Sequence, residues 1–318
     1  MDSHRPGYVA RINRVVDHID AHLAEPLDLA ALADVANFSP WHFHRLFQAL
    51  TGETLAERVR RRRLESAAIR LLVSPQQAAL SIALEVGFGS AEVFSRAFKA
   101  HFGVTPSAWR RGAWCDWAQR HREQLSKIHQ AQRKDHQAVI EALRHDAQPW
   151  QRRHDTHGAP ALNIELRTFP DTRVAYLRHV GPYGSSGIPL LWQRFAAWCG
   201  QHDLLQPGRA LVGVSQDSAD FTPPEKCRYD ACVPVDAGFR AEGEIGVQTL
   251  AGGRYACARF EGTAMEIHTA WMKVYGEWLP GSGYQPDDRP CLEVYDDGGV
   301  DPETGRFTCL LCVPLKPL

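Results

Sequence analysis

The chain has 318 residues, of which 44% are hydrophobic and 23% charged, as in ordinary soluble globular proteins. No apolar run approaches the roughly 18 residues of a membrane span, and the start, Met1–Pro6, lacks the apolar segment of an export signal. Composition therefore excludes a membrane protein and predicts a cytoplasmic location, with length enough for two domains.

The net charge of -1 conceals an asymmetry along the chain. Counting Lys and Arg against Asp and Glu gives +5 for residues 1–157 and -6 for residues 158–318, and residues 39–112 alone give +6. A basic module beside an acidic one is typical of a protein with one half that binds DNA and one half that does not.

The N-terminal half begins with a predicted amphipathic helix at 8–23, which Pro26 ends, and then contains one short motif twice, at 39–52 and 90–103. Each copy opens with a serine suited to an N-cap and closes on a glycine, so each predicts one helix. The matching pairs are Ser39/Ser90, Phe43/Phe94, Arg45/Arg96, Phe47/Phe98, Ala49/Ala100 and Gly52/Gly103.

A shorter helix is predicted before each copy, at 29–36 and at 81–86. Helix, tight turn and helix, written twice, is the arrangement that lays a second helix into the DNA major groove. A long helix at 55–73 would join the two units. It carries four arginines, Arg60–Arg63, which either contact phosphates or form a solvated face.

Residues 8–112 resemble the AraC/XylS family of transcription activators. The resemblance rests on Trp41-His42-x-x-Arg45-x-Phe47 and on Gly87-Phe88-x-Ser90 through Phe102-Gly103-x-Thr105-Pro106. It implies an all-α double helix-turn-helix domain at 1–112, with double-stranded operator DNA and RNA polymerase as partners. The DNA contacts it implies come from Trp41, His44, Arg45, Ser90, Glu92 and Arg96.

Two residues of the second reading helix, Ala91 and Val93, cannot hydrogen-bond to bases. We therefore expect the first unit to carry most of the sequence information and the second to supply mainly backbone affinity.

Residues 113–157 predict a helical linker between domains. Its histidines, including His121, His129, His136 and His145, are not spaced as tight i, i+4 pairs, so a solvated helix is expected rather than a metal site. All eight cysteines lie beyond residue 112. Cys309 and Cys312 would point to opposite faces of a strand, which disfavours zinc and favours free thiols in a reducing cytosol. We expect no metal and no cofactor.

Residues 158–318 contain a second duplication. Residues 164–181 match 245–262 at an offset of 81, and later segments match at an offset of 80, among them Val214/Val294 and Cys232/Cys312. Each half predicts strand, helix, strand, strand, with helices at 187–202 and 264–279 and late strands at 210–216, 227–235, 290–296 and 307–315. The expected class is a multidomain protein with a duplicated α+β unit, paired about a pseudo-two-fold axis with a cleft between the halves.

This half resembles the GyrI-like small-molecule-binding domain over about 160–318. The matching segments are Val174-Ala175-Tyr176, His179-x-Gly181-Pro182-Tyr183, Cys227-Arg228-Tyr229-Asp230, Gly252-Gly253-x-Tyr255-Ala256, Trp278-Leu279-Pro280-x-Ser282-Gly283-Tyr284 and Leu292-Glu293-x-Tyr295. The resemblance implies an aromatic-lined cleft for bulky cationic or aromatic effectors.

Strand parity separates Glu293 and Tyr295 from Leu292 and Val294. If the apolar face packs on the helices, Glu293 lies on the other side, opposite the space that its repeat partner Gly213 leaves. A carboxylate among aromatic rings can hold an organic cation; the alternative is an ordinary solvated glutamate. The candidate effector-binding residues are Glu293, Tyr183, Trp192, Trp271, Tyr275 and Tyr295.

Together these patterns predict a one-component transcription regulator with a DNA-binding half and an effector-binding half. No nucleophile–base pair stands out, so no catalytic residue is assigned. Two alternatives remain open: a cleft that hydrolyses or sequesters a reactive small molecule, with Glu293 activating water, and an effector domain that has become a protein-interaction module.

Overall fold

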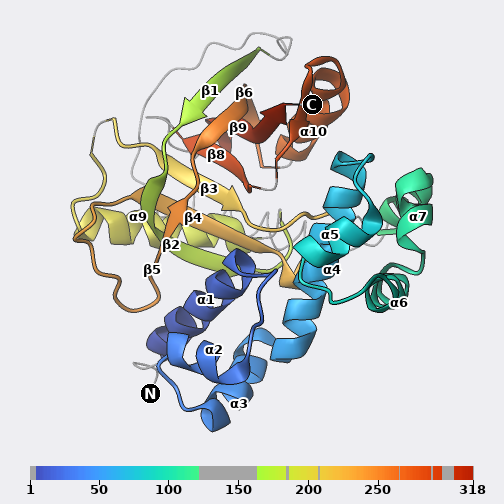
Figure 1. Ribbon diagram of the computed structural model, residues 1–318. Coiled ribbons are helices and arrows are strands. Elements are labelled where there is room, and N and C mark those ends of the chain that lie inside the picture. Colours follow the sequence, from blue (N-terminus) through green and yellow to red (C-terminus); the bar gives the residue numbers. More distant parts are fainter. Residues whose placement is uncertain are drawn as a thin grey trace. The chain divides into compact units, whose positions relative to one another are not determined.

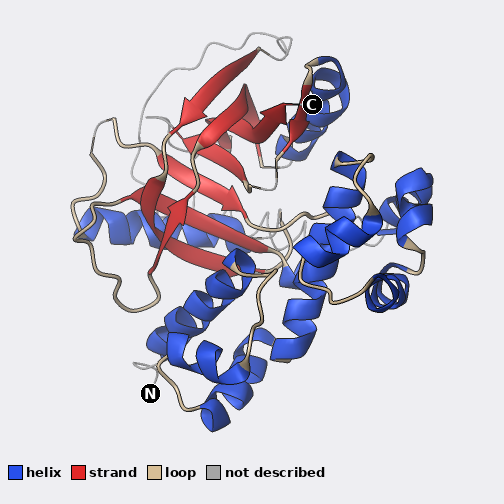
Figure 2. Ribbon diagram, in the orientation of Figure 1, coloured by secondary structure: helices blue, strands red, loops and turns tan. Residues whose placement is uncertain are grey.

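The computed structural model describes residues 5–121, 163–183, 186–206, 208–264, 266–287, 289–295 and 304–317, without the side chains of residues 5, 6 and 41. The chain divides into two compact units, residues 1–123 with 240–246 and residues 124–239 with 247–318. Helices dominate the first unit and a large sheet dominates the second (Figures 1 and 2). Of the expected linker, 114–121 is helical; the rest, with His129, His136 and His145, lies outside the described residues.

The helical unit contains the expected double helix-turn-helix. Its elements are α1 (Arg5–Ala21), α2 (Leu29–Val35), α3 (Pro40–Thr51), α4 (Leu55–Val73), α5 (Ala79–Glu85), α6 (Ala91–Phe102), α7 (Pro106–Ala108) and a π-helical turn, Trp109–Ala113. The two copied motifs are α3 and α6. Both end on a glycine in the left-handed region, Gly52 with φ 67° and Gly103 with φ 77°, a conformation that glycine adopts without a Cβ penalty.

The helices α3 and α6, which we call the reading helices, are each anchored by the apolar stripe that the sequence predicts. Phe43 and Phe47 are fully buried and pack with residues of α1 and α2, including Ile19 and Leu32. In the second helix-turn-helix, Phe98 meets the buried Trp109 edge to face and Phe102 packs against it at a tilt. The Trp109 indole N–H donates to the Ala68 carbonyl of α4. Aromatic packing of this kind fixes a helix against its support and leaves the opposite face in solvent.

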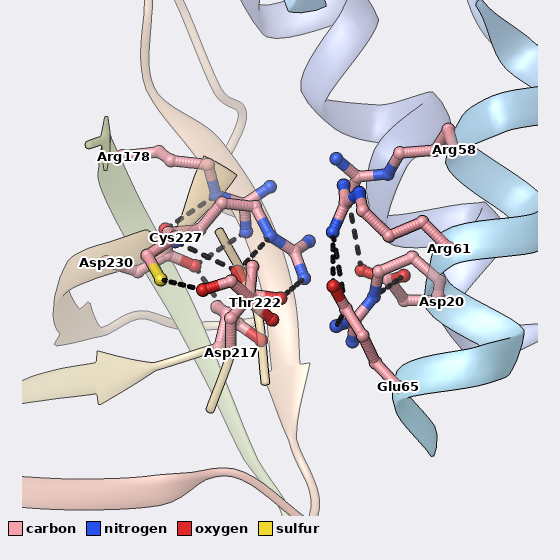
Figure 3. A network of polar contacts seen from close by, with 12 residues as sticks. Asp20, Arg58, Arg61, Glu65, Arg178, Asp217, Thr222, Cys227 and Asp230 are labelled. Carbon is pink, nitrogen blue, oxygen red and sulfur yellow. Dashed lines mark hydrogen bonds and ion pairs between the residues drawn. The ribbon is translucent and has the colours of Figure 1, made fainter. Parts of the chain in front are cut away.

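Three of the four arginines in the α4 run, Arg61, Arg62 and Arg63, do not form the solvated face that the sequence left open, because they bond within the protein; contact of Arg60 with phosphate stays a prediction. Arg61 is buried and bonds to Glu65 at 3.0 Å (Figure 3) and to Glu53 at 2.8 Å. Arg62 bonds to Asp20 at 2.9 Å and to Glu65 at 2.8 Å. Arg63 donates to the backbone carbonyls of Leu23, Glu25 and Gly87. Within the run, only Arg60 is exposed. These guanidinium groups connect α4 to both helix-turn-helix units, because α4 lies between them.

The C-terminal compact unit of the chain is built on one antiparallel sheet. Its elements are β1 (Ile164–Phe169), β2 (Thr172–Val180), α9 (Gly187–Gln201), β3 (Leu211–Ser215), a 3-10 turn (Pro224–Lys226), β4 (Arg228–Pro234), β5 (Gly246–Leu250), β6 (Gly253–Thr263), α10 (Ile267–Lys273), π and 3-10 turns (Val274–Trp278, Leu279–Gly281), β7 (Tyr284–Pro286), β8 (Cys291–Tyr295) and β9 (Arg306–Pro317). The duplicated α+β class is confirmed. Each half has one more strand at its start than expected, and the second half also contains β7.

Strand order in the sheet is β1-β6-β9-β8-β3-β4-β2-β5, with β7 beside β9. Exchanging the two halves reverses this order onto itself, so the pseudo-two-fold axis passes between β3 and β8. The extra strands are exchanged: β1 of the first half pairs with β6 of the second, and β5 of the second half pairs with β2 of the first. The two halves therefore share one sheet.

The sheet is apolar on both faces, and this changes the expected position of Glu293. One face carries a cluster that includes Val212, Val214 and Leu292. The other face packs Leu311 and Tyr295 against Trp271 and Val274 of the second helix. Parity thus separates Glu293 from Leu292 as predicted, but the helices cover the Glu293 face. The expectation that Glu293 lies away from the helices is wrong, because alternation alone does not show which apolar face receives them.

Arg61→Ala should destabilise the helical unit by about 3–5 kcal/mol, because it leaves Glu53 and Glu65 buried without this guanidinium. Burial opposes the charge on Arg61, but its bonds to Glu53 and the charges of Glu65 and Glu53 outweigh burial and raise the Arg61 pKa. Calorimetry of the full chain would show the helical transition moving to lower temperature. The control is Arg60→Ala, one residue away and exposed, which should change little. Equal shifts for both variants would contradict the structural role.

Candidate DNA-reading helices and effector site

The first reading helix presents polar side chains opposite its buried phenylalanines. His44 and Arg45 are exposed on α3, together with His42 and Gln48. Of the three candidates on this helix, Trp41 has a side chain outside the described part of the structure. An exposed arginine on such a helix has the reach and the donor geometry to read a guanine edge.

The second reading helix, α6, is organised differently. The Ser90 hydroxyl accepts from the Val93 amide at 3.3 Å and so caps the helix. Glu92 and Arg96 are exposed, and the Glu92 pKa is lowered by its own backbone N–H, by the Ser90 hydroxyl and by the Arg96 charge. Val93 is 47% exposed between them. The reading face of α6 thus offers an apolar residue where α3 offers polar ones.

The candidate effector site is centred on Glu293 of β8. Its cross-strand partner on β3 is Gly213, next to the pseudo-two-fold axis. The side chain is buried, with 7% of the residue exposed. Two hydroxyls donate to the same carboxylate oxygen, Oε2: that of Tyr229 at 2.5 Å and that of Tyr295 at 2.8 Å. Trp271 is a further hydrogen-bonding partner of the carboxylate.

Aromatic rings from both helices pack beside the tyrosines that bind this carboxylate. The Trp192 ring of α9 contacts Tyr295, with centroids 5.0 Å apart, and Tyr229, at 6.3 Å, both edge to face. Trp192 and Trp271 occupy matching places in the two halves, at an offset of 79. Each half of the duplication therefore contributes one indole to the surroundings of Glu293, while only the second half contributes a charge.

Tyr229 was not among the residues selected from the sequence. It lies on β4, and a Cβ at Gly213 would collide with its hydroxyl and come within 3.0 Å of Glu293 Oε2. The Tyr229 hydroxyl therefore occupies the space that Gly213 leaves, and from there it donates to Glu293. Two signals could have identified it: the Cys227-Arg228-Tyr229-Asp230 segment itself, and Cys309 at its repeat position, which shows that the aromatic side chain belongs to one half only.

Two other candidates have their hydroxyls engaged away from the carboxylate. The Tyr183 hydroxyl donates to the Arg228 carbonyl at 2.7 Å, and its ring meets Tyr229 at 6.4 Å. The Tyr275 hydroxyl contacts the Cys291 thiol at 3.0 Å. Both residues border the site, Tyr183 through Tyr229 and Tyr275 through the strand that carries Glu293.

Buried ion pairs hold the strand of Tyr229 from its other face. Arg178 forms a bidentate pair with Asp230, with both distances 2.7 Å (Figure 3). Arg228 forms another with Asp217, with both distances 2.8 Å. Gln216 and Gln248 also donate to Asp230. Paired charges flank Tyr229 on both sides along β4, so the backbone that aims its hydroxyl is fixed.

Burial is the dominant influence on the ionisable groups of the site. It raises the pKa of Glu293, and the hydrogen bonds from Tyr229, Tyr295 and Trp271 offset only part of that effect. Burial and the Glu293 charge raise the pKa values of Tyr229 and Tyr295 well above the ordinary value, so both remain hydroxyl donors. Among the described residues, no Lys or Arg forms an ion pair with Glu293.

The cysteines show the strand geometry expected for them. Cys309 belongs to the apolar cluster on the helix face and Cys312 to the cluster on the opposite face. In the described part of the chain, no group of three or more His, Cys, Asp or Glu residues is placed to hold a metal ion, and none of the helices combines the length and apolar character needed to cross a membrane.

The N-terminal half has two helix-turn-helix units joined by the helix α4, and the C-terminal half is a duplicated α+β unit with a buried aromatic site. This combination defines a DNA-binding regulator with a small-molecule-binding domain. Residues 32–112 match the family model of a helix-turn-helix domain, and residues 162–316 match that of the GyrI-like small molecule binding domain.

Relatives match the two parts separately. Regulatory protein SoxS of Salmonella typhimurium is 35% identical over 99 residues, which cover 31% of this chain and 92% of SoxS. The right origin-binding protein of Escherichia coli K12 is 39% identical over 93 residues, 29% of this chain and 32% of that protein. YosT, an SPbeta prophage-derived protein of Bacillus subtilis, is 26% identical over 155 residues, 49% of this chain and all of YosT. The chain belongs to the AraC family of DNA-binding transcription regulators and carries a GyrI-like domain.

The stability of the effector domain should depend on pH through Glu293. Because its pKa is raised in the native protein, the native state keeps this proton at pH values where the unfolded chain has lost it. The free energy of unfolding therefore falls as pH rises from about 4.5, the ordinary glutamate value, through the Glu293 pKa. Glu293→Gln should lose this part of the slope and be the more stable protein above that window.

Thermal unfolding of the full chain across a pH series measures this effect, and Glu261→Gln, on an exposed position of β6, is the control. A Glu293→Gln protein with the slope of the wild type would contradict the assignment.

Proposed function

We propose that this chain is a one-component regulator in which residues 1–112 bind a double-stranded operator and residues 158–318 bind an organic cation. The observation that carries the effector part is a buried carboxylate held by two tyrosine hydroxyls on one oxygen, with the Trp192 ring packed against both tyrosines. A buried carboxylate with a raised pKa and no cationic partner among the described residues gains most when a ligand supplies the positive charge.

For DNA, we propose base contacts from Trp41, His44 and Arg45 in the first unit and from Glu92 and Arg96 in the second. Ser90 contributes by capping α6 and by hydrogen-bonding to Glu92. The exposed polar face of α3 and the exposed Val93 on α6 support unequal shares of the sequence readout. The right origin-binding protein, which is similar to this part of the chain, is named for binding an origin.

For the effector, the surroundings of Glu293 favour a flat, aromatic cation. Charge attraction to the carboxylate and contact with the ring faces of Trp192 and Trp271 act on the same ligand. Such a ligand regulates DNA binding only if it binds differently to DNA-competent and incompetent states. We place the protein in the cytoplasm, with RNA polymerase as its partner at the promoter.

Arg45→Ala should weaken binding to the selected operator by roughly 1–3 kcal/mol and relax the preference at one base position. Arg96→Ala is the matched variant on the second helix. It should lower affinity with less effect on sequence preference, because α6 presents Val93 beside it. Selection from a randomised duplex library with the full chain measures both. Stronger information content under the second unit would overturn the assignment.

Glu293→Gln should weaken binding of an aryl ammonium cation by roughly ten- to a hundredfold, the loss of one charge-assisted contact of about 1.5–3 kcal/mol. The amide oxygen can still accept from Tyr229 and Tyr295, so the protein should remain folded. Calorimetry with the cation and with a neutral analogue of the same shape separates charge from burial. The neutral analogue should bind both proteins equally.

Equal affinity of the two proteins for the cation would show that the site does not use this carboxylate. Conversion of the compound during long incubation would instead support a hydrolytic activity.

A further inference from the structure

Among the described strands, β1 forms one edge of the sheet. It is the terminal strand of the order, and it pairs with β6 along one side (Figure 1). Residues 165–168 of its six are exposed, with Leu166 at 48%. The pseudo-symmetric edge strand β5 exposes Thr249 alone, between the buried Gly246 and Leu250. The two edges therefore differ in what they offer to another strand, and β1 presents the accessible one.

The charges on β1 alternate in a way that suits a second β1. Glu165 and Arg167 lie on the sheet face of Cys257 and Tyr255, where they form an exposed ion pair of 2.8 Å. Leu166 lies on the other face. Charged side chains on an edge strand usually oppose self-association. The two charges of β1 have opposite signs and lie two residues apart, with an apolar residue between them, so two copies can place opposite charges against each other.

Two-fold symmetry limits how two copies of β1 can pair. In an antiparallel ladder, directly opposed residues have side chains on the same face of the sheet. If a two-fold axis perpendicular to the sheet relates the two strands, one residue of β1 must therefore lie directly opposite the same residue of the other copy. That residue is the centre of the register. Within β1, centring on Leu166 or Arg167 opposes five residues, whereas centring on Glu165 or Thr168 opposes only three.

Pairing of the charged residues favours one of these centres. Centring on Glu165 opposes two glutamates, and centring on Arg167 opposes two arginines. Centring on Leu166 places each Glu165 opposite the other copy's Arg167, and Leu166 opposite itself. Like charges directly opposite destabilise a strand pair and opposite charges stabilise it, so one register remains.

We propose that β1 is a homodimerisation edge, at which a second copy of this chain adds its own β1 antiparallel in the register centred on Leu166. The intrastrand pair of Glu165 and Arg167 then becomes one part of a four-charge ring across the interface, and the sheet continues through both copies. Such a dimer carries two DNA-binding units related by a two-fold axis and fits an operator with two sites.

Charge exchange tests both the edge and the register. Glu165→Arg opposes arginine to arginine, and Arg167→Glu opposes glutamate to glutamate. Each single variant of the full chain should raise the dimer dissociation constant in sedimentation equilibrium by roughly ten- to a hundredfold. An equimolar mixture of the two single variants should associate again, because every opposed pair is then Arg with Glu. The double variant, Glu165→Arg with Arg167→Glu, should dimerise like the wild type.

Glu261→Arg is the control. It reverses the charge of an exposed ion-paired glutamate on β6, away from the edge, and should leave dimerisation unchanged. Leu166→Lys provides a second test, since it opposes two lysines at the axis and should also give monomers. Circular dichroism establishes that each variant is folded. A monomeric wild type, single variants that dimerise normally, or a mixture that stays monomeric would each overturn the proposal.

Discussion

The pairing of β3 with β8 is the constraint on which the effector domain depends. It joins the two halves of the duplication at the pseudo-two-fold axis and places Gly213 directly opposite Glu293. If the two halves were identical here, both positions would carry a glutamate or both a glycine. Because only one carries charge, and the other leaves room for the Tyr229 hydroxyl, a symmetric scaffold holds a single asymmetric site.

This site is unlike the other buried charges of the domain. Asp217 and Asp230 are each neutralised by a bidentate arginine, which offsets their loss of hydration. Glu293 receives hydroxyl and indole donors, which orient the carboxylate but do not cancel its charge. Under the proposed function, Glu293 costs stability in the ligand-free protein and would provide affinity when a cation binds, which is the usual compromise at a binding site.

Local sequence signals predicted the helices of the DNA-binding unit well. Ser90, Gly52 and Gly103 mark helix ends by their own conformational preferences, and α4 begins and ends where it was expected, at Leu55 and Val73. The arginine run was misjudged, because its partners Asp20 and Glu53 are remote in sequence or lie on another element. A pattern of charges does not show whether the surrounding chain will bury it.

The effector domain shows the same limit. The duplication predicted its class and its pseudo-symmetry, and strand parity correctly separated Glu293 from Leu292. The exchange of β1 and β5 between halves, and the choice of the face that receives the helices, depend on long-range pairing that alternation does not encode. Tyr229 was missed for that reason: it reaches Glu293 across the axis, from a strand 64 residues away.

We propose that Glu293 is a carboxylate kept for a ligand's positive charge. The most direct measurement is the affinity of the full chain for a permanently charged, non-titrating aromatic cation as a function of pH. If Glu293 must lose its proton to bind, affinity rises with pH through the raised Glu293 pKa and then levels off, while Glu293→Gln gives a flat profile. A wild-type profile as flat as that of the variant would contradict the account.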